Sequence, residues 1–377
     1  MREYIQRVNN EINSYCDNVN VHDLPVSHQY LLEKIVTPKF RHIFNVDSLD
    51  ELINRVVKKI SEKKKEEEIR ILSIGSGNCD FEINLLKKYS LRCTIDCHEL
   101  NMHMINRARE DANKKGINQY INFYVTDLNL VEIVGVFDLV IANHSLHHIE
   151  KLEKLFESIH ASMTDESYFI INDMIGRNGH MFWDNTFDFC KRLWATFPKE
   201  LKYNRLLNEY TPKRVQHDCS KNGFEGIRAQ DILPLLDQYF SFKDFLPFFS
   251  IANKFTDRDF GHNFNMSNPH HIAILDNIGA WDEYFLNNKL LKPTQLIATL
   301  VKKNVPVKDY CYVYFEKPSE IYSMDEGLFY TFFDTMDEVE KWRKKKSLFD
   351  KFIANYKEYG LFNTVEKVVK YLLNYHH

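Results

Sequence analysis

The chain has 377 residues, of which 44% are hydrophobic and 27% charged, and a formal net charge of −4 at pH 7. This length exceeds that of one minimal domain, and the apolar content is ordinary for a globular protein. Because the two signs of charge are mixed, the chain lacks the basic field that favours nucleic-acid binding, so we expect no nucleic-acid partner.

The sequence shows neither a signal region nor a membrane span nor a C-x-x-C pair, and these absences bear on where the protein is located and whether its cysteines are reduced. The first ten residues contain no apolar signal region, and no run approaches the roughly 20 apolar residues of a membrane span. The seven cysteines are scattered and form no C-x-x-C pair, which is typical of a reducing compartment. We therefore expect a cytoplasmic protein without a membrane span.

The amino-terminal residues 1–65 are predicted to form a helical extension on the substrate side of the molecule. Apolar residues recur at helical spacing, for example Leu49, Leu52, Ile53 and Val56. A charge run, Ser61–Glu68, follows them and is typical of a solvated helix end before a strand.

A glycine-rich turn follows this extension. The segment Ile71–Asp80 reads I-L-S-I-G-S-G-N-C-D, a short apolar strand that turns at Gly75 and Gly77 before a helical pattern at Phe81–Lys88. The third glycine of the dinucleotide fingerprint is missing. Asp80, in the first helical turn, would repel a phosphate but tolerate a cationic sulfonium.

Three more strands are predicted in order, and each ends at a polar residue. The segments are Thr94–Leu100 with Glu99, Ile121–Leu128 with Asp127, and Phe137–Asn143 with Asn143 itself. The carboxylate of Glu99, about 20 positions after the glycine turn, is suited to accept hydrogen bonds from a ribose diol.

Taken as a set, these segments resemble class I S-adenosylmethionine-dependent methyltransferases over about residues 69–303. The resemblance implies an α/β fold, with a Rossmann-like, seven-stranded, mostly parallel sheet, an antiparallel last strand, and helices on both faces. It implies S-adenosyl-L-methionine as cofactor and S-adenosyl-L-homocysteine as product. The positions that match the family's cofactor site are Gly75, Ser76, Gly77, Glu99, Leu100, Asp127, Leu128, Asn143 and His144.

The resemblance also implies boundaries for the methyltransferase domain and its later elements. The methyltransferase domain is expected at 66–303, with an aromatic-rich insertion at 174–223 that covers the active site. Its later elements are predicted as helices at Lys151–Ser162, Phe224–Phe240 and Pro269–Asn287, and as strands at Ser167–Asn172, Phe240–Phe249 and Thr294–Val301.

Residues 304–377 are expected to form an α-rich carboxyl-terminal extension. A short strand is predicted at Tyr310–Phe315 and two helices at Met336–Asn374. Two roles stay open for this extension: docking of a second copy or a protein partner, and packing on its own chain.

The catalytic candidates are His147 and His148, after the fourth strand, and Asp173, at the end of the fifth. A histidine is a natural base for a hydroxyl proton, and the arrangement resembles that of sugar O-methyltransferases. A similar histidine pair also occurs in relatives that methylate carbon or nitrogen, where one histidine only packs or caps a helix. The sequence leaves open which histidine is the base.

Acceptor binding is assigned to His180, Trp183 and Tyr203, because an aromatic face suits a sugar ring. No metal is expected, since the chain has no H-x-x-x-H helix motif. The sequence thus predicts an enzyme that methylates a small-molecule acceptor, most plausibly a hydroxyl of a sugar or secondary metabolite. The alternatives are an N-, C- or protein-directed methyltransferase and a non-catalytic scaffold with this fold.

Overall fold

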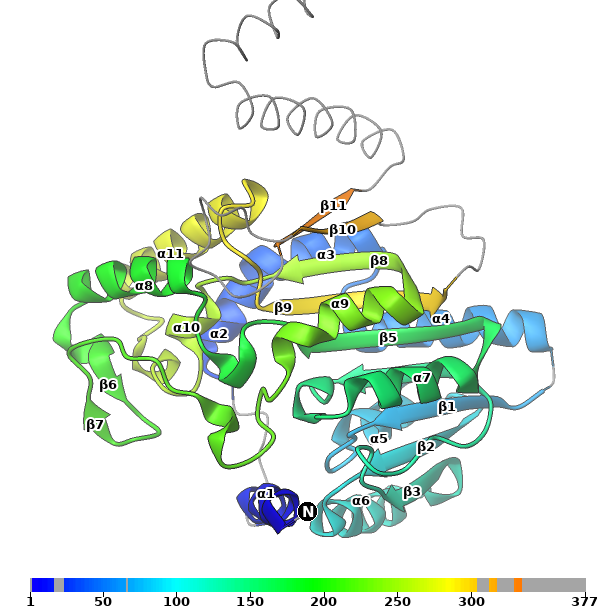
Figure 1. Ribbon diagram of the computed structural model, residues 1–377. Coiled ribbons are helices and arrows are strands. Elements are labelled where there is room, and N and C mark those ends of the chain that lie inside the picture. The colour runs from blue at the N-terminus through cyan, green and yellow to red at the C-terminus, as the bar shows by residue number, and fades with distance from the viewer. Residues whose placement is uncertain (1, 17–23, 66, 304–311, 317–328, 334–377) are drawn as a thin grey trace, which may run out of the picture.

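The computed structural model describes residues 2–16, 24–65, 67–303, 312–316 and 329–333. Its centre is a seven-stranded sheet of order β3-β2-β1-β4-β5-β9-β8 (Figure 1). The strands are β1 (Ile69–Ile74), β2 (Cys93–Glu99), β3 (Ile121–Val125), β4 (Phe137–Asn143), β5 (Met163–Met174), β8 (Phe240–Phe248) and β9 (Gln295–Lys302). Strands β1 to β5 pair in parallel, and β9 lies antiparallel between β5 and β8. The predicted fold class, including the inserted antiparallel last strand, is confirmed.

The sheet is buried on both faces, which explains the continuous apolar runs of its central strands. In β1, Ile71 belongs to the core on one face, while Leu72 and Ile74 belong to the core on the other. Helices cover both faces, as Figure 1 shows: α7 (Leu152–Ser162) and α9 (Ala229–Tyr239) on one, and α4 (Leu49–Lys64) and α5 (Asp80–Tyr89) on the other.

Helix α4 illustrates how the sequence determines a helix and its buried side. Its apolar residues are spaced three and four apart and are buried: Leu52, Ile53, Val56, Val57 and Ile60. Acidic residues stand in its first turn and lysines in its last, which complements the helix dipole.

The amino-terminal extension is helical, as expected. Helix α1 (Arg2–Ser14) stands apart from a second group, in which α2 (Val26–Leu31), a π-helical turn at Leu32–Val36 and α3 (Thr37–Phe44) follow one another directly. The second group packs near α11 (Pro269–Asn287), where the side chain of Ile35 lies against Gly279. Helix α6 (Met102–Lys114) packs on β2 and β3.

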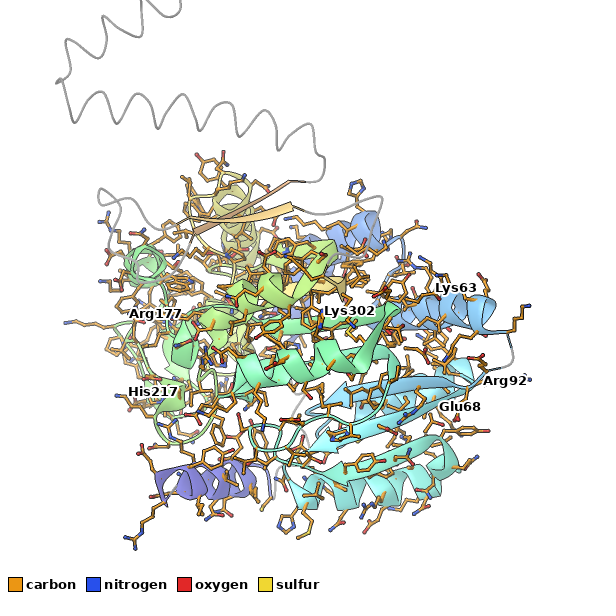
Figure 2. The ribbon with its side chains drawn as sticks, turned by 45° about the vertical axis from the view of Figure 1, so that its right-hand side comes forward. Lys63, Glu68, Arg92, Arg177, His217 and Lys302 are labelled. Carbon is orange, nitrogen blue, oxygen red and sulfur yellow. The ribbon has the colours of Figure 1, made fainter. Side chains whose placement is uncertain are left out.

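The insertion after β5 contains α8 (Asp184–Thr196) and a small hairpin of β6 (Tyr203–Asn204) and β7 (Glu209–Tyr210). Figure 2 shows Glu68 and Arg92, which precede β1 and β2, on the opposite side of the molecule from Arg177 and His217 of the insertion. The insertion therefore lies toward the carboxyl ends of the parallel strands, where ligands bind in open α/β sheets.

Three boundaries differ from those expected by three residues or more. Strand β3 ends at Val125 rather than Leu128. Strand β5 begins at Met163 rather than Ser167. Helix α9 begins at Ala229 rather than Phe224, because Gly226 adopts a left-handed φ of 67° and Ile227 donates its N–H to the carbonyl of His147. The segment before α9 is therefore a loop bound to the loop after β4.

In the carboxyl-terminal extension, β10 (Tyr312–Glu316) and β11 (Phe329–Phe333) form a separate antiparallel pair. The first overlaps the predicted strand, whereas the second was not expected in an α-rich segment. The two helices predicted at Met336–Asn374 lie outside the described residues. Over the described part of the chain, every helix is too short or too polar to traverse a lipid bilayer.

Candidate functional site

The glycine-rich loop after β1 requires its two glycines. Gly75 and Gly77 have φ values of 58° and 56°, in the left-handed region. A Cβ on Gly75 would lie 2.6 Å from the Cβ of Ser145, so no larger residue fits there. This contact places the loop directly against the segment that follows β4.

Two carboxylates stand at the neighbouring strand ends. Glu99 accepts the Gly77 N–H at Oε2 and the Asn101 N–H at Oε1, both at 2.9 Å. Burial raises the pKa of Glu99 above its ordinary value, although these N–H donors oppose the shift. Asp127 follows β3, and its Oδ2 accepts the hydroxyl of Tyr4 at 2.7 Å.

The other predicted cofactor residues lie along the same edge of the sheet. Leu100 is half-buried after β2, and Leu128 is buried after β3. Asn143, at the end of β4, accepts the side-chain amide of Asn172 at 2.9 Å. His144 is exposed and turns toward Asn172, with 3.1 Å between its Nε2 and the amide nitrogen. Ser76 lies in the glycine turn, 3.3 Å from the sulfur of Cys79.

This edge fits S-adenosylmethionine. A glycine turn too tight for a Cβ lets the backbone lie close to a ligand. The carboxylates of Glu99 and Asp127 supply acceptors for ribose hydroxyls and an adenine amino group, and each keeps further lone pairs beyond the bonds named above.

The catalytic candidates come together beside the glycine loop. Asp173 is fully buried and accepts the N–H groups of Ser145 and Leu146 at 2.9 and 2.7 Å. Its other oxygen lies 2.6 Å from Nδ1 of His147. The aspartate thereby fixes the loop after β4 and leaves Nε2 of His147 facing the site.

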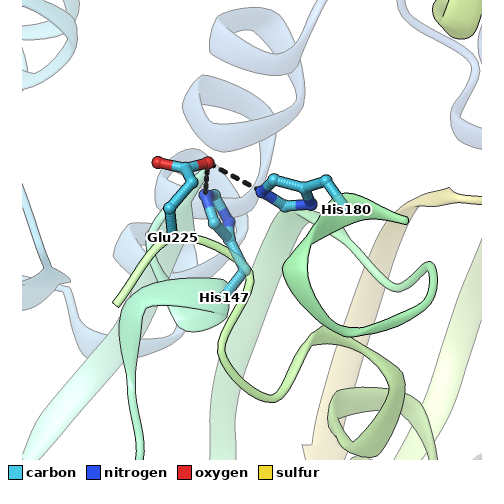
Figure 3. A group of neighbouring side chains, drawn as sticks. All are labelled: His147, His180 and Glu225. Carbon is cyan, nitrogen blue, oxygen red and sulfur yellow. Dashed lines mark hydrogen bonds and ion pairs between the residues drawn. The ribbon is translucent and has the colours of Figure 1, made fainter. Parts of the chain in front are cut away.

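A second carboxylate, Glu225, joins the histidines, as Figure 3 shows for two of them. Its Oε1 lies 2.7 Å from Nε2 of His180 and 3.6 Å from Nε2 of His147. Its Oε2 lies 3.6 Å from Nε2 of His148. We call His147, His148, His180, Asp173 and Glu225 the histidine cluster.

Backbone hydrogen bonds join the loops that carry His147, His180 and Glu225. The Ile227 N–H donates to the carbonyl of His147, and the Gly179 N–H donates to the carbonyl of Gly226. Gly226 adjoins His180 so closely that a Cβ would lie 3.0 Å from the imidazole. The position of Glu225 thus depends on the glycine that follows it.

The electrostatics distinguish the histidines. Burial lowers the pKa of His147, but the charges and hydrogen bonds of Asp173 and Glu225 outweigh it and raise that pKa to about 10. Burial lowers the pKa of His180 below its ordinary value. The histidines hold the pKa of Glu225 far below its usual range, despite its burial. His147 therefore holds its proton at neutral pH.

Helix α1 and the residue after it, Tyr15, add two side chains that no sequence motif marks. Glu11 Oε1 lies 2.8 Å from Nδ1 of His148, at ion-pair distance without the alignment of a hydrogen bond. The hydroxyl of Tyr15 donates to Oε2 of Glu225 at 3.4 Å. The sequence signal for Glu225 was equally weak, because it precedes a helix with no motif around it.

The predicted acceptor residues separate in space. His180 belongs to the histidine cluster. Trp183 is buried, with the ammonium of Lys292 4.0 Å from its ring centre. Tyr203 is 38% exposed on the β6–β7 hairpin, where the guanidinium of Arg205 covers its ring. The described contacts thus bring only His180 to the other catalytic candidates.

Donor atoms of His147, His180 and Glu225 lie within 4.8 Å of one another, a spacing that one metal ion can span. The 2.7 Å contact between His180 and Glu225 is the length of a hydrogen bond. We interpret the cluster as a proton-transfer network, and the expectation of a metal-free site stays a prediction.

Comparisons with known proteins agree with this geometry. Residues 65–233 match the family model described as a methyltransferase domain. A comparison with curated proteins gave no match. Among solved structures, the chain is similar to the O-methyltransferase from the trans-AT PKS multienzyme of Brevibacillus brevis in complex with S-adenosyl-L-homocysteine (12% identity, TM-score 0.40, 75% of this chain and 81% of that one). It is also similar to an S-adenosylmethionine-dependent methyltransferase from Mesorhizobium loti (13% identity, TM-score 0.36, 65% and 98%).

The family match and the strand order together identify a class I S-adenosylmethionine-dependent methyltransferase domain. The chain therefore carries a methyltransferase domain over residues 65–233.

Proposed function

We propose that this methyltransferase transfers a methyl group to a hydroxyl of a small-molecule acceptor, a sugar or a secondary metabolite. The observation that carries the proposal is the histidine cluster beside the glycine loop, where Gly75 contacts the segment that bears His147 and His148. A hydroxyl must lose its proton to become a good nucleophile, so it needs a base near the methyl group.

Glu99 and Asp127 would hold the ribose and adenine of the cofactor, with the glycine loop beneath its methionine part. S-adenosylmethionine supplies a methyl group on a positively charged sulfur: the new carbon–oxygen bond forms as the carbon–sulfur bond breaks and leaves its electron pair on sulfur. The remaining task of the chain is to align the acceptor with that bond and to take its proton.

His148 is the residue that we propose as the base. His147 already holds its proton at neutral pH, because its pKa is raised to about 10 between Asp173 and Glu225. The side chain of His148 is 23% exposed, against 4% for His147, and is therefore the more accessible to an acceptor. Its Nδ1 lies 2.8 Å from Glu11 and its Nε2 lies 3.6 Å from Glu225, so a proton taken from the acceptor would reside on a ring between two carboxylates.

His147 and Asp173 are then positioning residues. The protonated ring of His147 links the two carboxylates and holds Glu225 toward His148. His180 contacts the same Glu225 oxygen as His147 and could also contact the acceptor directly.

The cellular location of the reaction is also a proposal. We place it in the cytoplasm because the six cysteines that the structure describes are free thiols. A role of residues 304–377 in dimer formation or partner binding stays a prediction.

The test is a matched acceptor panel with methyl-labelled cofactor. It pairs methyl glycosides and hydroxylated polyketide-like compounds with amino analogues of the same shape. We expect a labelled methyl on oxygen, located by NMR, for one or more hydroxyl acceptors. Label found on nitrogen or carbon, or on protein acceptors alone, would overturn the proposal.

A further inference from the structure

Helix α1 and the two residues that follow it, Tyr15 and Cys16, contact the cofactor side of the site at three places. Tyr4 donates its hydroxyl to Asp127 at 2.7 Å. Asn101, which follows Glu99, donates its side-chain amide to the carbonyl of Ile12 at 3.1 Å. Arg107 of α6 donates to the carbonyls of Tyr15 and Cys16 at 3.1 and 3.0 Å.

Helix α1 and Tyr15, which follows it, also contact the histidine cluster. Glu11 lies 2.8 Å from His148 through one oxygen, and its other oxygen accepts the N–H of Phe224 at 3.2 Å. Tyr15 reaches Glu225, and its ring lies edge-on to that of His148 with centroids 6.5 Å apart. One helix therefore spans the ends of β2, β3 and β4, the edge where the cofactor site lies.

Two further contacts hold α1: Asn10 donates its side-chain amide to the carbonyl of Asn222 at 2.7 Å, and the ring of Tyr4 lies 5.6 Å from that of Phe224. The helix has 13 residues and buries none of them. A helix of this length is marginal by itself in water, and each hydrogen bond adds only a small net stabilisation. Helix α1 is therefore in equilibrium between a docked and an undocked state, and a ligand bound beneath it can shift this equilibrium.

We propose that α1 closes over the bound cofactor and, in closing, sets the catalytic histidine through Glu11. The inference rests on the proposed function in one respect, because it assigns the orientation of the proposed base to Glu11. Glu11 is a positioning residue: its carboxylate lies at ion-pair distance from Nδ1 of His148, and this charge favours the ring orientation that turns Nε2 toward the acceptor. The coupling lets proton removal proceed only when the cofactor site is covered.

The first test needs no acceptor. Trypsin can cut after Arg7 only when α1 leaves its docked position, since the docked side chain is only 27% exposed. We expect saturating S-adenosylhomocysteine to slow cleavage at Arg7 by about fivefold or more in the full-length protein. An unchanged rate at Arg7, with binding verified by calorimetry, would overturn the closure.

The second test concerns Glu11. Glu11→Gln keeps an acceptor for Phe224 but removes the charge beside His148. We expect kcat to fall by about tenfold or more, with the acceptor KM and the S-adenosylhomocysteine Kd within about twofold of the wild-type values. Glu3→Gln is the matched control on the same helix, because the Glu3 side chain is 87% exposed.

The outcomes separate the two proposals. Absence of O-methylation by the wild type would refute the proposed function, and the cleavage assay would still decide the closure of α1. Normal kcat in Glu11→Gln, with an active wild type, would refute the positioning role alone. Loss of cofactor binding in Glu11→Gln would also refute it, because the defect would then be structural.

Discussion

Glu225 is the residue that unites the site. Its carboxylate lies within 3.6 Å of Nε2 atoms of His147, His148 and His180. Because those rings favour its ionised form, its pKa lies far below the usual range. A carboxylate held in this way stabilises a new positive charge on His148 without itself taking the proton.

The role assigned to Glu99 predicts a loss of cofactor affinity. Glu99→Ala removes the acceptor for the ribose hydroxyls together with the partner of the Gly77 and Asn101 N–H groups. We expect S-adenosylhomocysteine affinity to fall by about 30-fold or more, roughly 2 kcal/mol or more, in a calorimetric titration. Glu110→Ala, at an exposed position on α6, should bind like the wild type. Equal affinity in the Glu99 variant would contradict the role.

At the residue scale, the sequence predicted the strand-end residues and missed those brought in from elsewhere. Glu99, Asp127 and Asp173 could be found because parallel strands place their carboxyl ends at one edge. Glu11 and Glu225 could not, because α1 and the loop before α9 reach the site only through tertiary contacts. The acceptor-binding role of Tyr203 stays a prediction, since the described contacts place its ring beside Arg205 on the β6–β7 hairpin.

Among the elements, α5 carries a buried acid that predicts a pH effect on stability. Glu82 accepts the hydroxyl of Ser73 at 2.6 Å, and its second oxygen has no hydrogen-bond partner among the described residues. Burial raises its pKa from 4.5 to about 7. Below pH 4.5 the Glu82 carboxyl is protonated in both the folded and unfolded states. Folding then buries no charge, and the group does not lower the free energy of unfolding.

Stability should therefore fall as the pH rises from about 4.5 to 7, by about 3 kcal/mol from this group. Glu82→Gln is expected to lose that pH dependence, and urea unfolding at pH 5 and pH 8 measures it. Glu62→Gln, at an exposed position, serves as the control. A Glu82→Gln protein with the same decline as the wild type would show that Glu82 is not the source.

Helix α11 supports the loop after β8 through one carboxylate. Asp282 is fully buried, and its Oδ1 accepts the N–H groups of Ser250, Ile251 and Ala252 at 2.7 to 2.9 Å. Asp282→Ala leaves three buried donors unpaired and should lower the free energy of unfolding by about 3 kcal/mol. Asp282→Asn keeps an acceptor oxygen and should lower the free energy of unfolding by less. Equal losses of stability in the two variants, measured by thermal unfolding, would contradict the role of the acceptor oxygen.

At the scale of the whole molecule, cofactor binding and folding are linked. The proposed cofactor residues come from the ends of β1 to β4, so the site exists only in the folded sheet. A ligand at 100 times its Kd stabilises the folded state by about 2.7 kcal/mol, which should raise Tm by roughly 3 °C. Differential scanning fluorimetry with S-adenosylhomocysteine measures the shift. A constant Tm at saturating ligand would contradict a preformed site.

The fold was more predictable than the site because each strand carries its own local pattern. The apolar runs and the polar residues at their ends determine the sheet order once the connections are known. The pairing of β10 with β11 and the docking of α1 depend on long-range contacts that leave no such pattern.

The most direct test of the account is methyl transfer by His148→Gln beside the wild type. Both are compared on one hydroxyl acceptor with deuterium-labelled S-adenosylmethionine, after calorimetry has shown equal S-adenosylhomocysteine affinity. We predict that the variant loses about 100-fold or more in kcat, since a positioned base contributes roughly that much. Unchanged transfer to the same oxygen would contradict the claim that His148 removes the acceptor's proton.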